Sequence, residues 1–184
     1  MAFNIEQFKS NFGDGGARPN LFRARINLPS ALGGQMLGQG SFLIKSAQIP
    51  SATVTAIDVP YFGRQVRVAG NRTFEPWTVT IMNTETFSIR NDMEKWMSKI
   101  NSHNDNIAEA ATLQSYKADA TVEHLKKSGP SSESPDVAAS YQFFGMFPTE
   151  ISSIELGWEN NDTIEEFTVT FAYDYWHHAG QVTN

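Results

Sequence analysis

The chain has 184 residues, no cysteine, and 20 acidic against 14 basic side chains, which gives a net charge of −6 at pH 7. Its length and its 40% hydrophobic content predict a single domain, residues 1–184, with one core. The absence of cysteine excludes disulfides and thiolate metal ligands or nucleophiles, and it suits a reducing cytoplasm. No basic and then apolar leader opens the chain and no stretch has the ~20 apolar residues of a membrane span, so we expect neither secretion by signal peptide nor membrane insertion.

Charge is distributed unevenly along the chain. Residues 1–127 carry all 14 Lys and Arg with 11 acids, a net charge of +3, whereas residues 128–184 carry 9 acids and no Lys or Arg. The two blocks have opposite net charge. Either they form oppositely charged parts of the folded subunit, or the difference exists only in the sequence. Tight binding of nucleic acid needs clustered Lys and Arg, so the acidic balance argues against it.

The first part of the chain predicts an arm followed by strands. The run Gly13-Asp14-Gly15-Gly16 predicts a flexible arm over residues 1–19. Beyond it, alternating apolar and polar side chains predict strands, with a Gly-rich loop at 30–41 and a ribbon or projecting loop at 61–71. These strands are expected at 22–28, 42–49, 53–59 and 77–82, with Pro29, Pro50 and Pro60 ending the first three.

The hydrophobic period then changes from 2 to 3.6, which predicts one helix over residues 86–100. Asn83 or Thr84 is its expected cap, and residues 101–112 and 128–139 are expected to be loops. Further strands are expected at 116–124, 141–147, 151–158 and 165–176, with a turn at residues 160–162. The pattern therefore predicts a mainly β protein, an antiparallel sandwich or barrel with one flanking helix.

Two of these strands have one apolar face and one face of short polar side chains. Such a polar face suits a sheet that meets water without offering anchor points. The polar residues of residues 77–82 and 165–176 that we expect to share this face are Thr78, Thr80, Glu166, Thr168, Thr170 and Asp174.

Residues that could carry chemistry form no convincing site. Asp174, His177 and His178 could suggest a metal site, but adjacent histidines on a strand point to opposite faces. The Gly-rich run at 33–40 lacks the Lys-Ser/Thr of a phosphate-binding loop, and no G-x-S-x-G motif is present. We therefore predict no catalytic, cofactor or metal site. A carbohydrate-binding sandwich remains an alternative, with an enzyme third, and the aromatic platform of such a sandwich would be drawn from Trp77, Trp158, Tyr173, Tyr175 and Trp176.

Three segments resemble the major tail tube proteins of contractile-tailed, T-even-like bacteriophages. They are residues 17–22 (ARPNLF), residues 66–83 (VRVAGNRTFEPWTVTIMN) and residues 147–176, which begin FPT and end DYW. The sequence departs from that family at residues 29–41, 101–112 and 128–139 and in a longer C-terminal tail, residues 177–184. These departures lie in predicted loops, so they bear on surface contacts rather than on the core.

The resemblance implies a structural virion protein with no cofactor. Hexameric rings would stack into the inner tube of a contractile tail, and the sheets of neighbouring subunits would join into one continuous barrel around a lumen that conducts DNA. The implied partners are further copies of the chain, the tail sheath protein, and baseplate and tail-terminator proteins, assembled in the host cytoplasm, with genomic DNA in transit. A tube protein of a type VI secretion system or another contractile injection system is the related alternative.

Two assembly surfaces follow as hypotheses. The segment that contains Tyr61, Arg64, Arg67 and Arg72 is expected to dock one ring onto the next, with the acidic block 128–184 as its partner. The face of Thr78, Thr80, Glu166, Thr168, Thr170 and Asp174 is expected to line the lumen and give it a negative potential.

Overall fold

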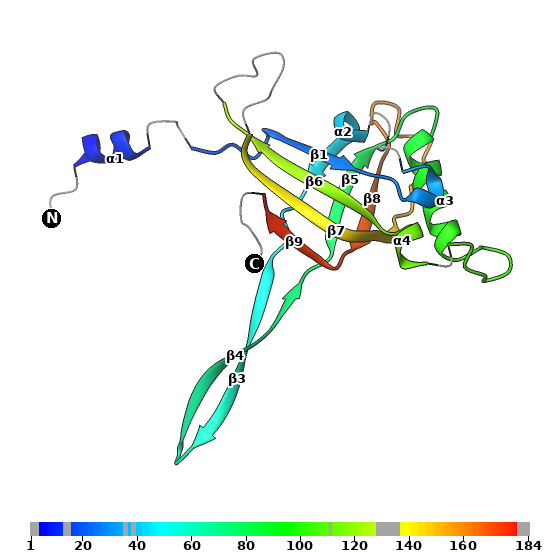
Figure 1. Ribbon diagram of the computed structural model, residues 1–184. Helices are drawn as coiled ribbons and strands as arrows, with labels where there is room; N and C mark the ends of the chain where they lie inside the picture. Colours follow the sequence, from blue (N-terminus) through cyan, green and yellow to red (C-terminus); the bar gives the residue numbers. More distant parts are fainter. Residues whose placement is uncertain are drawn as a thin grey trace.

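The computed structural model describes residues 4–12, 16–34, 37, 40–110, 112–127 and 137–179. Its fold is mainly β and antiparallel, as the alternation in the sequence predicted (Figure 1). Over the described residues the elements are α1 (Ile5–Asn11), β1 (Phe22–Ile26), η1 (Ser30–Leu32), α2 (Gly40–Leu43), β2 (Ile44–Ala47), β3 (Ala52–Tyr61), β4 (Arg64–Phe74), β5 (Trp77–Met82), α3 (Ser88–Ile100), α4 (Leu113–Tyr116), β6 (Ala118–Leu125), β7 (Val137–Ile151), β8 (Glu166–Ala172) and β9 (Tyr175–His178).

The body of the molecule is one curled sheet, in which the described strands lie in the order β1-β6-β7-β8-β5-β2 with β9 also beside β7. Strand β7 connects the two halves of this sheet. Its first part pairs with β6 and β9, and its last part, from Phe147 on, pairs with β8. The inner faces of both halves and one face of α3 enclose a single hydrophobic core.

The core is built by the alternation that the sequence shows. Trp77, Val79 and Ile81 of β5 are fully buried, and the indole of Trp77 stacks on Phe143 of β7 at 4.7 Å between ring centroids. The helix α3 contributes Trp96, whose Nε1 donates a 2.7 Å hydrogen bond to the carbonyl of Tyr116. Burial of such side chains stabilises the fold by about 1.5–3 kcal/mol each.

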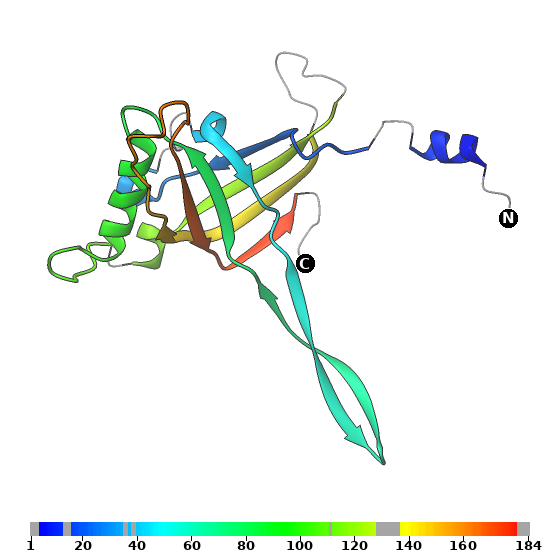
Figure 2. The ribbon, with the colours of Figure 1, turned by 180° about the vertical axis from the view of Figure 1, so that it is seen from behind.

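Strands β3 and β4 form a separate two-stranded ribbon that projects away from the body (Figures 1 and 2). The ribbon predicted for residues 61–71 is present and is longer than expected. Proline does not end β3, because Pro60 pairs with Gln65 in a ribbon with open edges, where a missing N–H is tolerated. Phe62 and Gly63 make the turn with φ values of 43° and 79°, as a two-residue type I′ hairpin requires.

The prediction of a strand at residues 151–158 is wrong. Strand β7 runs from Val137 to Ile151, and residues 152–165 form a loop. The apolar alternation continues through this segment, but only Ile154 packs on the core, whereas Leu156 and Trp158 are exposed. Ser152 makes the last hydrogen bonds of this segment to β8, at Thr168, and the chain leaves the sheet after it.

The single strand predicted at 165–176 is interrupted. Strand β8 ends at Ala172, opposite Phe147 of β7, and β9 begins at Tyr175, opposite Phe144, so Gly145 lies between these two pairings. Gly145 has φ of +65°, and a Cβ at this position would overlap the carboxylate of Asp174. The bend of β7 therefore needs a glycine at the point where β8 and β9 separate.

Other boundaries differ from the prediction by a few residues. The helix α3 begins at Ser88 after Phe87, which has φ of 52°, so neither Asn83 nor Thr84 caps it. The strand predicted from residue 42 begins only at Ile44, after the short helix α2. A short helix, α1, lies within the predicted arm, and most of the predicted loop 128–139 falls outside the described residues, as do residues 180–184 of the predicted tail.

Candidate assembly surfaces

The predicted threonine face exists on the side of β5 and β8 that points away from the core. Thr78 lies opposite Thr170 and Thr80 lies opposite Thr168 in the antiparallel register, and Glu166 follows opposite Met82. These side chains are partly buried, since each stands between neighbours on adjacent strands. The structure thus brings together five of the six residues predicted for this face.

Two further charged residues belong to the same polar face, although the alternation in the sequence does not place them there. Lys45 of β2 forms a 2.6 Å ion pair with Glu166, and Glu150 of β7 lies opposite Thr170. Each of these two strand pairings contains a register shift, so the alternation in the sequence does not predict which face Lys45 and Glu150 occupy. Lys45 therefore offsets part of the negative charge expected on this face.

Asp174 is not on β8. It lies in the break between β8 and β9, where its backbone N–H donates to the carbonyl of Phe144 at 2.9 Å. Its two carboxylate oxygens each lie 2.7 Å from Nζ of Lys117. The prediction that Asp174 shares one strand with Thr168 and Thr170 is therefore wrong, because the bend at Gly145 interrupts that strand.

The four residues predicted for stacking all lie on the ribbon, but they do not form one cluster. Tyr61 and Arg64 pair at the tip, Arg67 makes a 3.3 Å ion pair with Asp58, and Arg72 lies near the root. Eight residues of strand place Arg72 about 26 Å from Arg64. The structure adds Phe62, which is 92% exposed at the turn and contacts Tyr61 edge to face at 4.9 Å.

The root of the ribbon is tied to the body by aromatic side chains. Tyr173 Oη donates a 2.5 Å hydrogen bond to the carbonyl of Glu75, and Trp77 Nε1 donates a 2.7 Å bond to the carbonyl of Gln48. Phe74 packs against Tyr173 and Trp176. Burial, with a smaller contribution from the negative charge of Glu75, raises the pKa of Tyr173 to about 12.

The residues that could suggest other chemistry have packing roles. His177 stacks on Phe144 at 5.0 Å, and no group of three metal-ligating side chains occurs among the described residues. Of the aromatic residues considered for a sugar platform, Trp77 is buried and both Tyr173 and Trp176 pack on the core. Over the described ranges, every helix is too short or too polar to cross a bilayer.

The fold is shared with chains in solved structures of contractile injection systems. The structure of the anti-feeding prophage baseplate contains a chain that superposes with a TM-score of 0.64 at 8% identity, over 90% of this chain and 96% of that one. The tube-terminating cap of the same prophage gives 0.62 at 16% identity, over 89% and 90%. The sheath-tube complex of an extracellular contractile injection system gives 0.56 at 14% identity, over 96% and 98%.

Similarity in sequence shows the family to which the chain belongs. The family model described as phage tail tube protein matches residues 17–179. The tail tube protein gp19 of Enterobacteria phage T4 is 33% identical over 161 residues, which cover 87% of this chain and 90% of gp19. The tail tube protein of Serratia phage KSP90 is 26% identical over 172 residues, 92% and 93% of the two chains. The chain belongs to the phage tail tube protein family, as the resemblance in the sequence implied.

Proposed function

We propose that this chain builds the inner tube of a contractile phage tail, as hexameric rings that stack into a conduit for DNA. The observation that carries the proposal is the curled sheet, which has a polar outer face and, over the described residues, strands β1 and β2 each paired on one side only. Open strand edges favour aggregation, and joining them between subunits in a closed ring removes them.

The comparisons support the partners in this proposal. The similar chains in solved structures come from sheath-tube, baseplate and terminator assemblies, so we expect a sheath protein, baseplate proteins and a tail terminator around this tube. The role is structural, with no reaction catalysed. We expect the protein to be part of the virion tail after assembly in the host cytoplasm.

The face of Thr78, Thr80, Glu166, Thr168 and Thr170 is our candidate for the lumen wall. Duplex DNA carries about one negative charge per 1.7 Å and is held by basic surfaces through counterion release. Short neutral side chains with Glu150 and Glu166 offer DNA no such hold, and Lys45 is occupied by Glu166. A wall of this kind would let DNA pass without pausing.

A tube protein of a type VI secretion system or another injection machine is the second candidate. The injection-system structures named above share the fold but are 8–16% identical to this chain, whereas phage T4 gp19 is 33% identical. This difference in identity favours the phage tail. A carbohydrate-binding sandwich is disfavoured because its would-be platform is largely packed against the core.

Electron microscopy of the purified protein across a concentration series tests the proposal. Six-fold rings or hollow tubes are expected at high concentration, or when a baseplate is present to nucleate growth. A protein that remains monomeric at high concentration with baseplate present would contradict it.

A further inference from the structure

The loop between β7 and β8, residues 152–165, displays an unusual combination of side chains. Trp158 is 99% exposed, more than any other large apolar side chain of the described residues, and Leu156 is 85% exposed. Large apolar side chains grouped on a surface mark contact sites, and tryptophan is among the strongest anchors of protein interfaces. The four charged residues of the loop are all acidic: Glu155, Glu159, Asp162 and Glu165.

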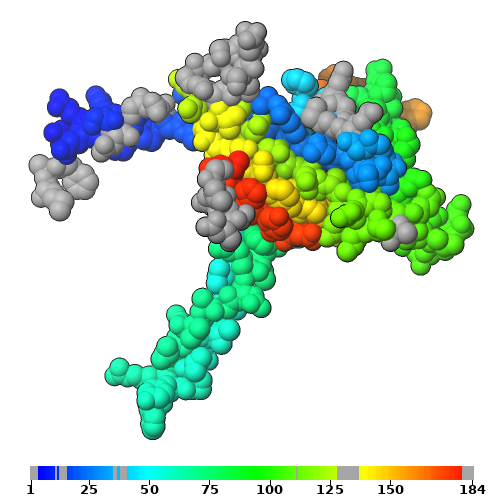
Figure 3. Space-filling model, viewed as in Figure 1, coloured from blue at the N-terminus to red at the C-terminus, as the bar shows by residue number. Residues whose placement is uncertain are grey.

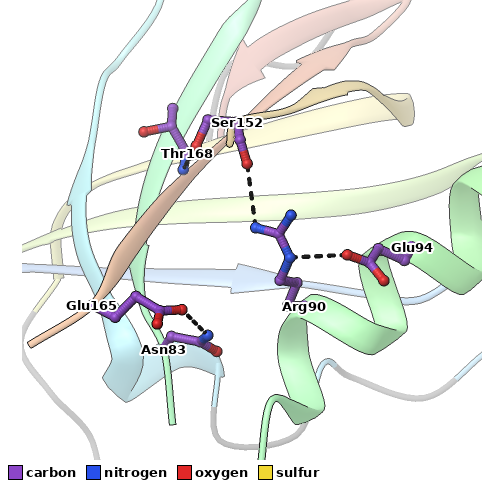
Figure 4. A network of polar contacts seen from close by, with 6 residues as sticks. All are labelled: Asn83, Arg90, Glu94, Ser152, Glu165 and Thr168. Atoms are coloured by element: carbon purple, nitrogen blue, oxygen red, sulfur yellow. Dashed lines mark hydrogen bonds and ion pairs between the residues drawn. The ribbon is translucent and has the colours of Figure 1, made fainter. Parts of the chain in front are cut away.

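Both ends of this loop are held in place (Figure 4). At one end Ser152 accepts a 3.2 Å hydrogen bond from Arg90 Nη1 on its carbonyl and a 2.9 Å bond from the Thr168 N–H on its hydroxyl. At the other end Asn83 Nδ2 donates a 2.6 Å bond to Glu165. A loop with fixed ends loses less conformational entropy when it binds a partner.

The tip of the β3–β4 ribbon has the complementary composition. It displays Tyr61 and Phe62, which are 66% and 92% exposed, next to Arg64 and Arg67. Phe62 has φ of 43°, a conformation that an aromatic residue rarely adopts. Asp58, Arg64 and Arg67 give residues 58–67 of the ribbon a net charge of +1, against −4 for the loop.

The ribbon and the orange part of the loop lie on opposite sides of the body. In both Figure 1 and Figure 2 the ribbon extends downward, whereas the loop rises from the end of β7 and its orange part reaches the upper edge of the body. Figure 3 shows that the ribbon stands clear of the body. A contact between two different surfaces on opposite sides of identical chains is heterologous and repeats along an axis.

We infer that the loop 152–165 of one copy of this chain receives the ribbon tip of another copy in the adjacent ring. Leu156 and Trp158 contact Tyr61 and Phe62, and the acidic side chains of the loop, Glu155 and Glu159, face Arg64 at the tip. This inference rests on the proposed stacking of rings, and it gives the acidic part of the chain one defined receptor site.

Disulfide cross-linking tests the contact directly, because the native chain has no cysteine. One population carries Gln65→Cys near the ribbon tip and a second carries Glu159→Cys in the loop. After co-assembly and oxidation we expect a linked dimer of one subunit of each kind, which is absent from unassembled protein. The control pairs Gln65→Cys with Ile107→Cys, an exposed residue outside the loop. Tubes without the linked dimer, or with equal linkage in the control, would overturn the inference.

A truncation of the anchors tests its energetic role. We expect Leu156→Ala with Trp158→Ala to form rings that need about tenfold or more protein to grow into tubes, compared with wild type and with Ile107→Ala. Because both side chains are exposed, the thermal unfolding midpoint should not fall. Normal tube growth by the double variant would refute this inference but not the proposed function. Normal tubes that no longer bind sheath protein would assign the loop to the sheath instead. Absence of rings in the wild type would contradict the proposed function itself.

Discussion

The hydroxyl of Tyr173 lies 2.5 Å from the carbonyl oxygen of Glu75, so the residue that follows β8 holds the end of the ribbon strand β4. On the other strand, Trp77 holds the segment before β3 through the carbonyl of Gln48. Both strands of the ribbon are therefore fixed to the body where they leave it. These two bonds and the packing of Phe74 on Tyr173 and Trp176 hold the root of the ribbon against the body.

We expect Tyr173→Phe to lower the free energy of unfolding by about 1 kcal/mol at neutral pH, because a hydrogen bond is lost while the ring remains. Urea denaturation of both proteins measures the difference.

The difference should also depend on pH. The pKa of Tyr173 is raised to about 12 in the folded protein, whereas an unfolded tyrosine ionises near 10. Its stabilising contribution is therefore complete below pH 10 and is lost as the pH rises toward 12. The gap between wild type and Tyr173→Phe should narrow from pH 9 to 11.5, and a constant gap would show that Tyr173 is not the titrating group.

Gly145→Ala should destabilise the protein by about 2–4 kcal/mol, since it combines a left-handed backbone with overlap of the Asp174 carboxylate. The matched control is Gly63→Ala, which also has positive φ but has no neighbouring atom near its Cβ. Thermal unfolding measures both. The double variant Gly145→Ala with Asp174→Ala should recover the part due to overlap, and no recovery would mean that strain alone is responsible.

Local patterns predicted the parts of the fold that depend on local sequence. The alternation of Trp77, Val79 and Ile81 with threonine is a period of two, which a strand with one buried face requires. The hydrophobic stripe of α3 and the existence of a ribbon were predicted on similar grounds. The threonine face followed from the same alternation.

Contacts between distant parts of the chain were not predictable. The bend at Gly145 separates β8 from β9 and removes Asp174 from the strand, and Lys45 reaches the polar face only through the pairing of β2 with β5. The segment with Ile154 and Trp158 alternates like a strand but finds no partner. Whether an alternating segment pairs is decided by what lies beside it, which the sequence pattern does not contain.

Reversal of charge on the ribbon should weaken stacking. With Arg64→Glu and Arg67→Glu, we expect tubes to grow more slowly at low salt, with a smaller defect at high salt, because exposed pairs are worth only about 0–1 kcal/mol each and are screened. Light scattering across a salt series measures growth. The control, Lys95→Glu with Lys126→Glu, makes the same change of charge elsewhere. Equal growth of the Arg64 and Arg67 variant and wild type at every salt concentration would contradict docking by the ribbon.

A basic lumen should slow the passage of DNA. Phage particles that carry Thr80→Lys and Thr168→Lys should assemble but eject DNA more slowly than wild type, most of all at low ionic strength. Particles with Asn104→Lys and Ile107→Lys carry the same added charge away from this face and should eject at the normal rate. Ejection measured by a DNA-binding dye distinguishes the two, and identical rates for both variants would place the threonine face away from DNA.

A cryo-electron microscopy structure of the assembled tube tests the central claim most directly. We predict six-fold rings in which the sheets of neighbouring subunits join, with Thr78, Thr80, Thr168 and Thr170 on the lumen wall and a negative potential inside. A tube with a net basic wall, or one in which these threonines are buried away from the lumen, would contradict the account.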